Sequence, residues 1–253
     1  MIKVSVVTPT YDRERFLPAF YRMFCAQDYP VLELLVADDS PVASPFFSSL
    51  DDTRVRYVHL PSRISIGEKR NRLIDASSGE IIVSFDDDDY YAPGYVSGMV
   101  RALGGADMVK LVGWYVHAVA ENATFYWDTE VNHPAHFKVG NGPTTLVSAQ
   151  RFVPDFIEKN VDGYGFSYVL RQSVFNTMRF PDQDFGEDLA LVQSLRKRGC
   201  TIVHIQDERQ SVVHMMHGRT TSMVFPQYRL PPGLARQLFP GLAEHLASVG
   251  MHD

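Results

Sequence analysis

Four consecutive aspartates, residues 86–89, follow directly after an apolar run over residues 81–85. The β-branched residues of this run predict a buried strand, and such strands are typical of parallel sheets. Adjacent carboxylates repel one another and raise each other's pKa unless a cation lies among them. Carboxylate oxygens are ligands that Mg²⁺ and Mn²⁺ prefer, commonly together with substrate phosphates. Ligands of open α/β sheets bind at the carboxyl ends of strands, so this position favours a cation site over a solvated acidic loop.

Two further acidic pairs lie at the ends of predicted elements. Asp38-Asp39 follows a predicted strand over residues 32–37, and Glu187-Asp188 begins a predicted helix over residues 187–198. In a parallel sheet the first pair lies at the same edge as the aspartate run, so the two can share a ligand. Each pair also has a structural alternative, which is a turn acceptor for Asp38-Asp39 and favourable helix N-terminal charge for Glu187-Asp188.

Strands and helices alternate through the first half of the chain and are less regular afterwards. In the first half we predict strands over residues 4–8, 32–37, 55–60, 81–85 and 108–115, with helices over 15–27, 66–76 and 95–103. In the second half we predict short strands over 144–147, 166–170 and 201–205, the helix over 187–198, and an amphipathic segment over 234–249. This order predicts an α/β fold with a doubly wound, mostly parallel sheet and a short helical C-terminal tail.

The composition is that of an ordinary globular protein, with 253 residues, 45% hydrophobic and 21% charged. A net charge of −6 argues against general binding to nucleic acid. The two cysteines, Cys25 and Cys200, have no metal or disulfide spacing, which favours a reducing cytoplasm. We find no signal peptide and no run near the ~18 apolar residues of a transmembrane helix. We therefore expect a cytoplasmic protein, with peripheral docking on a membrane left open and the oligomeric state unknown.

Five segments, in this order, resemble the family 2 glycosyltransferases, which have the nucleotide-sugar-binding fold called GT-A. The segments are residues 6–13, 36–40, 67–80, 85–89 and 185–188. Each is weak alone, but their order across residues 4–222 is a strong signal. The resemblance implies a GT-A domain over residues 1–225, with a donor-binding half at about 1–115 and an acceptor and catalytic half at about 116–225. Residues 226–253 would then form the helical tail.

The resemblance also assigns roles in donor binding. Residues 86–88 match the family's Asp-X-Asp motif, in which Asp88 binds Mn²⁺ or Mg²⁺ directly and Asp89 supports the loop. His217 matches a histidine of the family and would bind the metal or the diphosphate, whereas His214 is the weaker candidate. The remaining residues implied to contact the donor are Pro9, Thr10, Tyr11, Asp38, Asp39, Arg70, Asp86 and Asp87. Among these Arg70 would face the diphosphate, unless it lies on a solvated helix face.

For catalysis the resemblance implies one in-line displacement that inverts the anomeric configuration. Asp188 would act as the general base toward an acceptor hydroxyl, and the metal would stabilise the leaving nucleoside diphosphate. Glu187 would bind the acceptor or support the loop. Trp127 and Tyr164 can stack on an acceptor sugar, although aromatic residues in such positions more often belong to the core.

The predicted function is therefore metal-dependent glycosyl transfer from a nucleoside-diphosphate sugar, with a UDP-sugar favoured. The acceptor would be a carbohydrate, a lipid-linked sugar or a small molecule. A nucleotidyltransferase is a less favoured alternative, because it needs a glycine-rich phosphate loop and residues 8–15 contain no glycine. A non-catalytic nucleotide-sugar-binding subunit is also less favoured, because Asp88 and Asp188 are both present.

Overall fold

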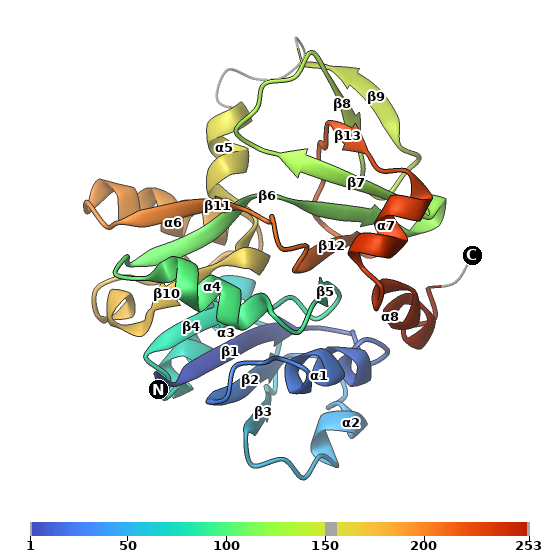
Figure 1. Cartoon of the computed structure of the whole chain (residues 1–253). Helices are drawn as coiled ribbons and strands as arrows, with labels where there is room; N and C mark the ends of the chain where they lie inside the picture. Colours follow the sequence, from blue (N-terminus) through green and yellow to red (C-terminus); the bar gives the residue numbers. More distant parts are fainter. Residues whose placement is uncertain (1, 150–155, 252–253) are drawn as a thin grey trace.

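The computed structural model describes residues 2–149 and 156–251 and consists of one large sheet with helices on both faces, plus a separate hairpin (Figure 1). The first half contains β1 (Val4–Thr10), α1 (Leu17–Cys25), β2 (Leu32–Asp38), α2 (Pro45–Ser48), β3 (Val55–His59), α3 (Ile66–Ala76), β4 (Ile81–Ser84), β5 (Tyr90–Tyr91), α4 (Tyr95–Leu103) and β6 (Met108–Ala118). The second half contains β7 (Ala123–Asp128), β8 (Ala135–Lys138), β9 (Thr145–Ser148), α5 (Phe156–Asp162), β10 (Val169–Arg171), α6 (Glu187–Lys197), β11 (Ile202–Gln206), β12 (Val212–Met216), β13 (Tyr228–Arg229), α7 (Pro232–Leu238) and α8 (Leu242–Ser248).

The large sheet has the strand order β13-β7-β6-β10-β4-β1-β2-β3, with β11 and β12 also pairing with β6. Strands β3, β2, β1 and β4 are parallel neighbours. Strand β10 is antiparallel to both β4 and β6. Strand β7 is antiparallel to β6, and β5 is antiparallel to β12. The other described strands of this sheet share one direction. The predicted α/β class with a mostly parallel sheet is therefore confirmed.

The two faces of the sheet have separate cores. On β1, Val4 and Val6 belong to the cluster that includes the buried side chains of α1 and α4. The side chain of Val7 is on the opposite face of the strand and belongs to the cluster that includes the apolar residues of α3 and α6. This alternation follows the two-residue period of a strand and fits a doubly wound arrangement. Both cores hold the strand ends in place, where the acidic residues lie.

Some predicted elements differ from the structure. Helices α3 and α4 have the predicted bounds, whereas β7 and β12 were not predicted as strands. The strand predicted over residues 166–170 is wrong in its first part, because a 3₁₀ turn over Gly165–Ser167 precedes β10. The amphipathic segment over 234–249 is divided into α7 and α8 at Pro240-Gly241. This is expected because proline has no N–H to donate a helical hydrogen bond.

The C-terminal tail packs closely on the large sheet. Strand β13 pairs with β7, and Phe239 and Met251 are buried in the same core as α1 and α4. Figure 1 shows α7 and α8 beside β12 and β5, whereas the β8–β9 hairpin lies at the end of the molecule opposite α2 and β3. No helix in the described part of the chain has the length and apolar character needed to cross a membrane.

Candidate active site

The acidic segments gather at one edge of the large sheet. In the parallel register of β1 and β2, Thr10 lies beside Asp38. Strand β4 pairs with the other side of β1 up to Ser84, so the aspartate run leaves the sheet next to Thr10. The parallel sheet therefore brings Asp38-Asp39 and residues 86–89 together, as the sequence predicted.

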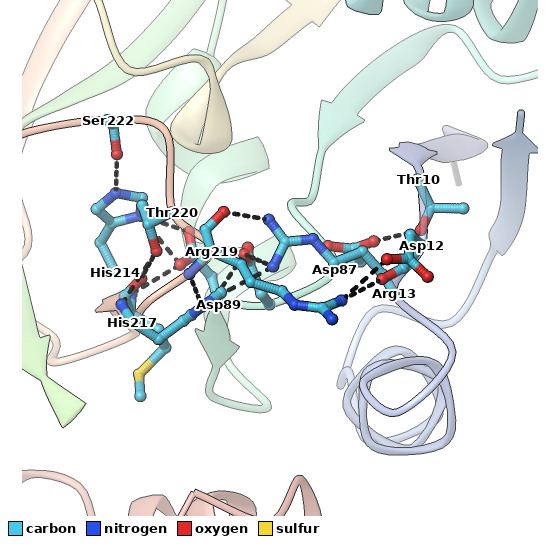
Figure 2. A network of polar contacts seen from close by, with 12 residues as sticks. Thr10, Asp12, Arg13, Asp87, Asp89, His214, His217, Arg219, Thr220 and Ser222 are labelled. Atoms are coloured by element: carbon cyan, nitrogen blue, oxygen red, sulfur yellow. Dashed lines mark hydrogen bonds and ion pairs between the residues drawn. The ribbon is translucent and has the colours of Figure 1, made fainter. Parts of the chain in front are cut away.

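Each member of the aspartate run has a different partner. Asp87 accepts a hydrogen bond from the Thr10 hydroxyl. Asp88 Oδ2 is 2.9 Å from His217 Nε2 and 3.1 Å from Arg13 Nη1. Figure 2 shows this network between Thr10 at the end of β1, Asp12 and Arg13 in the loop that follows, and His217 and Arg219 in the segment after β12. The run thus joins loops that are about 200 residues apart in the sequence.

The partners set the charge of the run. Burial raises the pKa of Asp87, and the neighbouring Asp88 carboxylate acts in the same direction. Burial also opposes ionisation of Asp88, but the hydrogen bond from His217 and the charge of Arg13 outweigh it and lower the pKa of Asp88. Asp88 is therefore the member whose negative charge its surroundings favour most clearly, as a cation ligand requires.

His217 lies between the Phe16 ring and Asp88. Its ring stacks on Phe16 with centroids 5.2 Å apart. Its Nδ1 accepts a hydrogen bond of 3.2 Å from the backbone N–H of Arg219. This hydrogen bond assigns the proton to Nε2, which then donates to Asp88. Binding of a metal by Nε2 would require that this proton move to Nδ1, which would give up the hydrogen bond from the Arg219 N–H.

His214 and Asp89 form a second, more deeply buried pair. His214 Nδ1 lies 2.9 Å from an Asp89 oxygen, and the other Asp89 oxygen accepts from the backbone N–H of Met215 at 2.8 Å. Burial opposes the imidazolium, yet the Asp89 carboxylate raises the pKa of His214 to about 9. His214 Nε2 lies 3.2 Å from Ser222 Oγ, so both ring nitrogens have partners. This pair attaches the aspartate run to β12 and so positions His217.

Asp38 and Asp39 accept hydrogen bonds from the protein itself. Asp38 accepts from the Ser40 backbone N–H at 2.9 Å and from the Tyr57 hydroxyl at 2.7 Å, which is the turn arrangement considered as its alternative. Asp39 accepts from the buried Lys69 ammonium at 2.7 Å and from the Ile64 N–H at 2.9 Å. Lys69, which the sequence did not identify, also donates to the carbonyl of Thr10 at 3.0 Å.

Tyr11, one of the residues expected to contact the donor, lies next to a further arginine. Arg63 packs over the ring of Tyr11, 4.3 Å from its centroid, so one face of that ring is already covered. Pro9 and Thr10 are the last two residues of β1, and of these Thr10 is buried and Pro9 is partly exposed. A nucleotide base stacked on Tyr11 would therefore use the other face of the ring or displace Arg63.

Arg70 is buried and connects two acidic segments, so the solvated helix face considered for it is wrong. Its Nη2 lies 3.6 Å from Asp86, its Nε lies 3.5 Å from Glu187, and its Nη1 donates to Ser84 Oγ at 3.2 Å. Helix α3 is held in this position through Gly67, because a Cβ there would lie 1.9 Å from the carbonyl oxygen of Pro181. Arg70 therefore ties the aspartate run to the start of α6.

Asp188 is held by backbone amides. Its Oδ2 accepts from the N–H of Gly165 at 2.9 Å, and its Oδ1 accepts from the N–H of Leu189 at 2.6 Å. A Cβ on Gly165 would lie 3.1 Å from Asp188 Cβ and 3.3 Å from Arg70 Nη2, so glycine permits this close approach. Burial raises the pKa of the neighbouring Glu187, whose charge is favoured by Arg70.

The two aromatic acceptor candidates differ in burial. Trp127 is only 1% exposed and packs between Trp114 and Tyr164, with ring centroids 5.2 Å from each. Such burial argues for a core role of Trp127 and against direct acceptor contact. Tyr164 is partly exposed, has a positive φ of 68°, and donates its hydroxyl to the carbonyl of Met223 at 2.8 Å.

Asp88 and His217 form the candidate metal pair. Among the described residues, no group of three or more His, Cys, Asp or Glu side chains is arranged to hold a metal ion. Mg²⁺ is nevertheless commonly held by one or two protein ligands together with substrate phosphates and water. The Asp88 carboxylate is the kind of ligand that Mn²⁺ and Mg²⁺ prefer, and the imidazole of His217 lies 2.9 Å from it as a candidate second ligand. The donor set therefore fits a metal whose remaining ligands come from a diphosphate.

Proteins similar in sequence to this chain are named as glycosyltransferases. The model of the family described as Glycosyl transferase family 2 matches residues 5–177. A beta-1,3-glucosyltransferase of Campylobacter jejuni, named for GalNAc(5)-diNAcBac-PP-undecaprenol, is 27% identical over 209 residues, which cover 81% of this chain and 63% of the relative. The putative colanic acid biosynthesis glycosyl transferase WcaA of Escherichia coli is 28% identical over 98 residues, covering 37% of this chain and 35% of the relative. The chain thus spans less than two thirds of these relatives.

Solved structures share the fold at low sequence identity. S. aureus TarS 1–349 in complex with UDP-GlcNAc has a TM-score of 0.63 and 15% identity, with 98% of this chain and 73% of that chain covered. The mannosyltransferase PcManGT from Pyrobaculum calidifontis, in complex with GDP-Man and Mn²⁺, has a TM-score of 0.59 and 16% identity, with 100% and 65% covered. The predicted GT-A fold is confirmed by this likeness. From the family match over most of its length, this chain belongs to glycosyl transferase family 2.

Proposed function

We propose that the protein transfers a sugar from a nucleoside-diphosphate donor to an acceptor hydroxyl, depends on Mn²⁺ or Mg²⁺, and inverts the anomeric configuration. The observation that carries this proposal is the placement of the Asp88–His217 pair and of Asp188 around the same sheet edge, connected through Asp86, Arg70 and Glu187. A UDP-sugar is the favoured donor, which agrees with the UDP-GlcNAc bound by the structurally similar TarS.

The donor would lie along the carboxyl ends of β1, β2 and β4. Asp88 and His217 would hold the metal, which supplies positive charge to the leaving diphosphate when bound. Tyr11 would line the base, whereas Asp38 and Asp39 support the wall of this site through Tyr57 and Lys69. The Mn²⁺ named with the structurally similar PcManGT supports the choice of metal.

Asp188 would act on the acceptor. The amides of Gly165 and Leu189 fix its orientation, and each carboxylate oxygen keeps a lone pair to take the proton of the attacking hydroxyl. The hydroxyl oxygen forms a bond to the anomeric carbon as the bond to the diphosphate breaks, and one such displacement inverts the configuration. Tyr164 and Glu187 are the proposed acceptor contacts, and the acceptor itself is a carbohydrate, a lipid-linked sugar or a small molecule.

A thermal-shift screen tests the proposal. We expect a UDP-sugar to raise the melting temperature more with Mn²⁺ than without it, and GDP-, CDP- and dTDP-sugars to raise it less. Slow release of free UDP from the stabilising donor should accompany binding, because water can replace the acceptor. No shift with any nucleotide sugar contradicts the proposal. Binding without release of UDP, even with a wide set of acceptors, would instead favour a non-catalytic binding subunit.

A further inference from the structure

Arg13 contacts both of the proposed metal ligands. Its Nη1 lies 3.1 Å from Asp88 Oδ2 and 3.3 Å from His217 Nε2. Its Nη2 donates to the backbone carbonyl of Arg219 at 3.2 Å. The guanidinium also lies over the Phe16 ring, 5.5 Å from its centroid, which is the ring on which His217 stacks. Arg13 is thus a permanent positive charge at the atoms that a divalent ion would use.

The guanidinium and a divalent ion exclude each other at this pair. Asp88 Oδ2 is the oxygen that both Arg13 and His217 contact, and the guanidinium of Arg13 is a positively charged donor with no acceptor atom. Two cations around one partly buried carboxylate oxygen repel each other strongly. The side chain of Arg13 is only 17% exposed, so solvent screens this repulsion weakly. An ion can therefore bind well only if Arg13 moves away.

The charged link between the loop of Arg13 and the loop of Arg219 lies at the surface. The loop of Arg13 is joined to the loop of Arg219 by a contact of Arg219 Nη1 to Asp12 Oδ2 at 3.1 Å. Both of these side chains are more than half exposed, and exposed ion pairs add little stability. A diphosphate is the natural alternative partner for a guanidinium, because its oxygens accept charge-assisted hydrogen bonds.

We propose that Arg13 competes with the divalent ion for Asp88 and His217, and that the donor's diphosphate relieves this competition by taking up the guanidinium. The inference rests on the proposed function, because it uses the same metal pair. It makes metal binding conditional on the nucleotide. An ion then binds tightly when a nucleoside diphosphate is present, and only weakly by itself. The coupling is of the size seen between linked sites, about 5- to 150-fold.

The test is the affinity for Mn²⁺ alone, measured by the electron paramagnetic resonance signal of free Mn²⁺ during titration. We expect Arg13→Met to bind Mn²⁺ about tenfold or more tightly than the unaltered protein when no nucleotide is present. Arg13→Lys keeps the charge and should remain close to the unaltered protein. Arg15→Met is the matched control, because Arg15 is exposed and lies over the same Phe16 ring. It removes a nearby charge without touching Asp88.

A second titration in the presence of UDP separates the possible failures. We expect UDP to tighten Mn²⁺ binding strongly in the unaltered protein and much less in Arg13→Met. Equal Mn²⁺ affinity of the two proteins without UDP overturns the competition, even if UDP and Mn²⁺ bind together. Absence of Mn²⁺ binding in every variant with UDP present overturns both the competition and the proposed metal dependence.

Discussion

Asp88 and Asp188 lie around one sheet edge but are held in opposite ways. Asp88 is contacted by the side chains of His217 and Arg13, which come from two distant loops. Asp188 is contacted by the backbone N–H groups of Gly165 and Leu189. The guanidinium of Arg13 can be exchanged for another cation, whereas backbone amides stay in place while the carboxylate takes a proton. This difference agrees with the proposed roles, which are an exchangeable ion at Asp88 and a fixed base at Asp188.

The largest effect is expected for Asp188→Asn. The amide keeps the size of the side chain but cannot take a proton at neutral pH, so transfer should fall by about 10²- to 10⁴-fold. Donor binding should be unchanged, because the metal pair is not touched. The measurement is the rate of UDP release with acceptor present. Asp75→Asn is the control, since Asp75 is exposed and pairs with Arg179 on the surface. An Asp188→Asn protein with full activity would remove Asp188 as the base.

An intermediate effect is expected for Gly165→Ala. The added Cβ would meet Asp188 Cβ at 3.1 Å and must push it by a few tenths of an ångström. Because a misplacement of about 1 Å can cost about 10²-fold, we expect transfer to fall about tenfold with UDP binding retained. Gly105→Ala is the matched control, because no atom lies within 4 Å of its added Cβ. Equal rates for the two variants would show that the position of Asp188 is not critical.

The smallest effect on transfer is expected from Lys110, which supports the fixed side. Its buried ammonium donates to the carbonyl of Gly163 at 2.8 Å, next to the turn that carries Gly165. Burial lowers the pKa of Lys110 to about 7, although Asp162 acts in the opposite direction. The pKa of a lysine in the unfolded chain is about 10.4. Between pH 7 and this value the unfolded chain binds more protons than the folded chain, so the stability that depends on this group rises with pH. The slope is about 1.4 kcal/mol per pH unit.

Lys110→Met should remove this contribution. Urea unfolding of the unaltered protein and the variant at pH 7, 8 and 9 measures the difference between the two slopes. We expect the free energy of unfolding of the unaltered protein to increase relative to that of the variant as the pH rises. Parallel curves would mean that Lys110 is not charged differently in the folded and unfolded chains. Transfer by the variant should change by less than tenfold, because Lys110 contacts neither carboxylate.

The parts of the fold that local pattern determines could be predicted. Helix α3 has its predicted bounds because Ser65 accepts from the Glu68 N–H at its start and its apolar residues follow the helical period. Strand β12 was missed, because its apolar residues are explained only by pairing with β6 and β5, which are far away in the sequence. The predicted division of residues 1–225 into a donor-binding half and an acceptor half, with residues 226–253 as a tail, stays a prediction.

The site could be predicted in composition but not in its contacts. The aspartate run was identified from residue types and order, whereas the roles of His217 and Asp188 came from the resemblance to the family and stay predictions. Asp89 pairs with His214. This contact joins residues 125 positions apart, which no local pattern encodes. Arg13 belonged to a recognised segment, but its role was not assigned. A cation in the loop after β1, facing the aspartates across a parallel sheet, was the signal available for it.

The most direct test of the comparison is calorimetry of UDP with Mn²⁺ on three proteins, which are the unaltered chain, Asp88→Asn and Asp188→Asn. If Asp88 binds the ion and Asp188 is the base, Asp88→Asn loses the Mn²⁺-dependent part of UDP binding. Removal of a metal ligand should weaken that binding about 100-fold or more, beyond the 10- to 100-fold cost of losing an outer partner. Asp188→Asn should bind UDP and Mn²⁺ as the unaltered chain does. Equal binding by Asp88→Asn, or its loss in Asp188→Asn, would contradict the account.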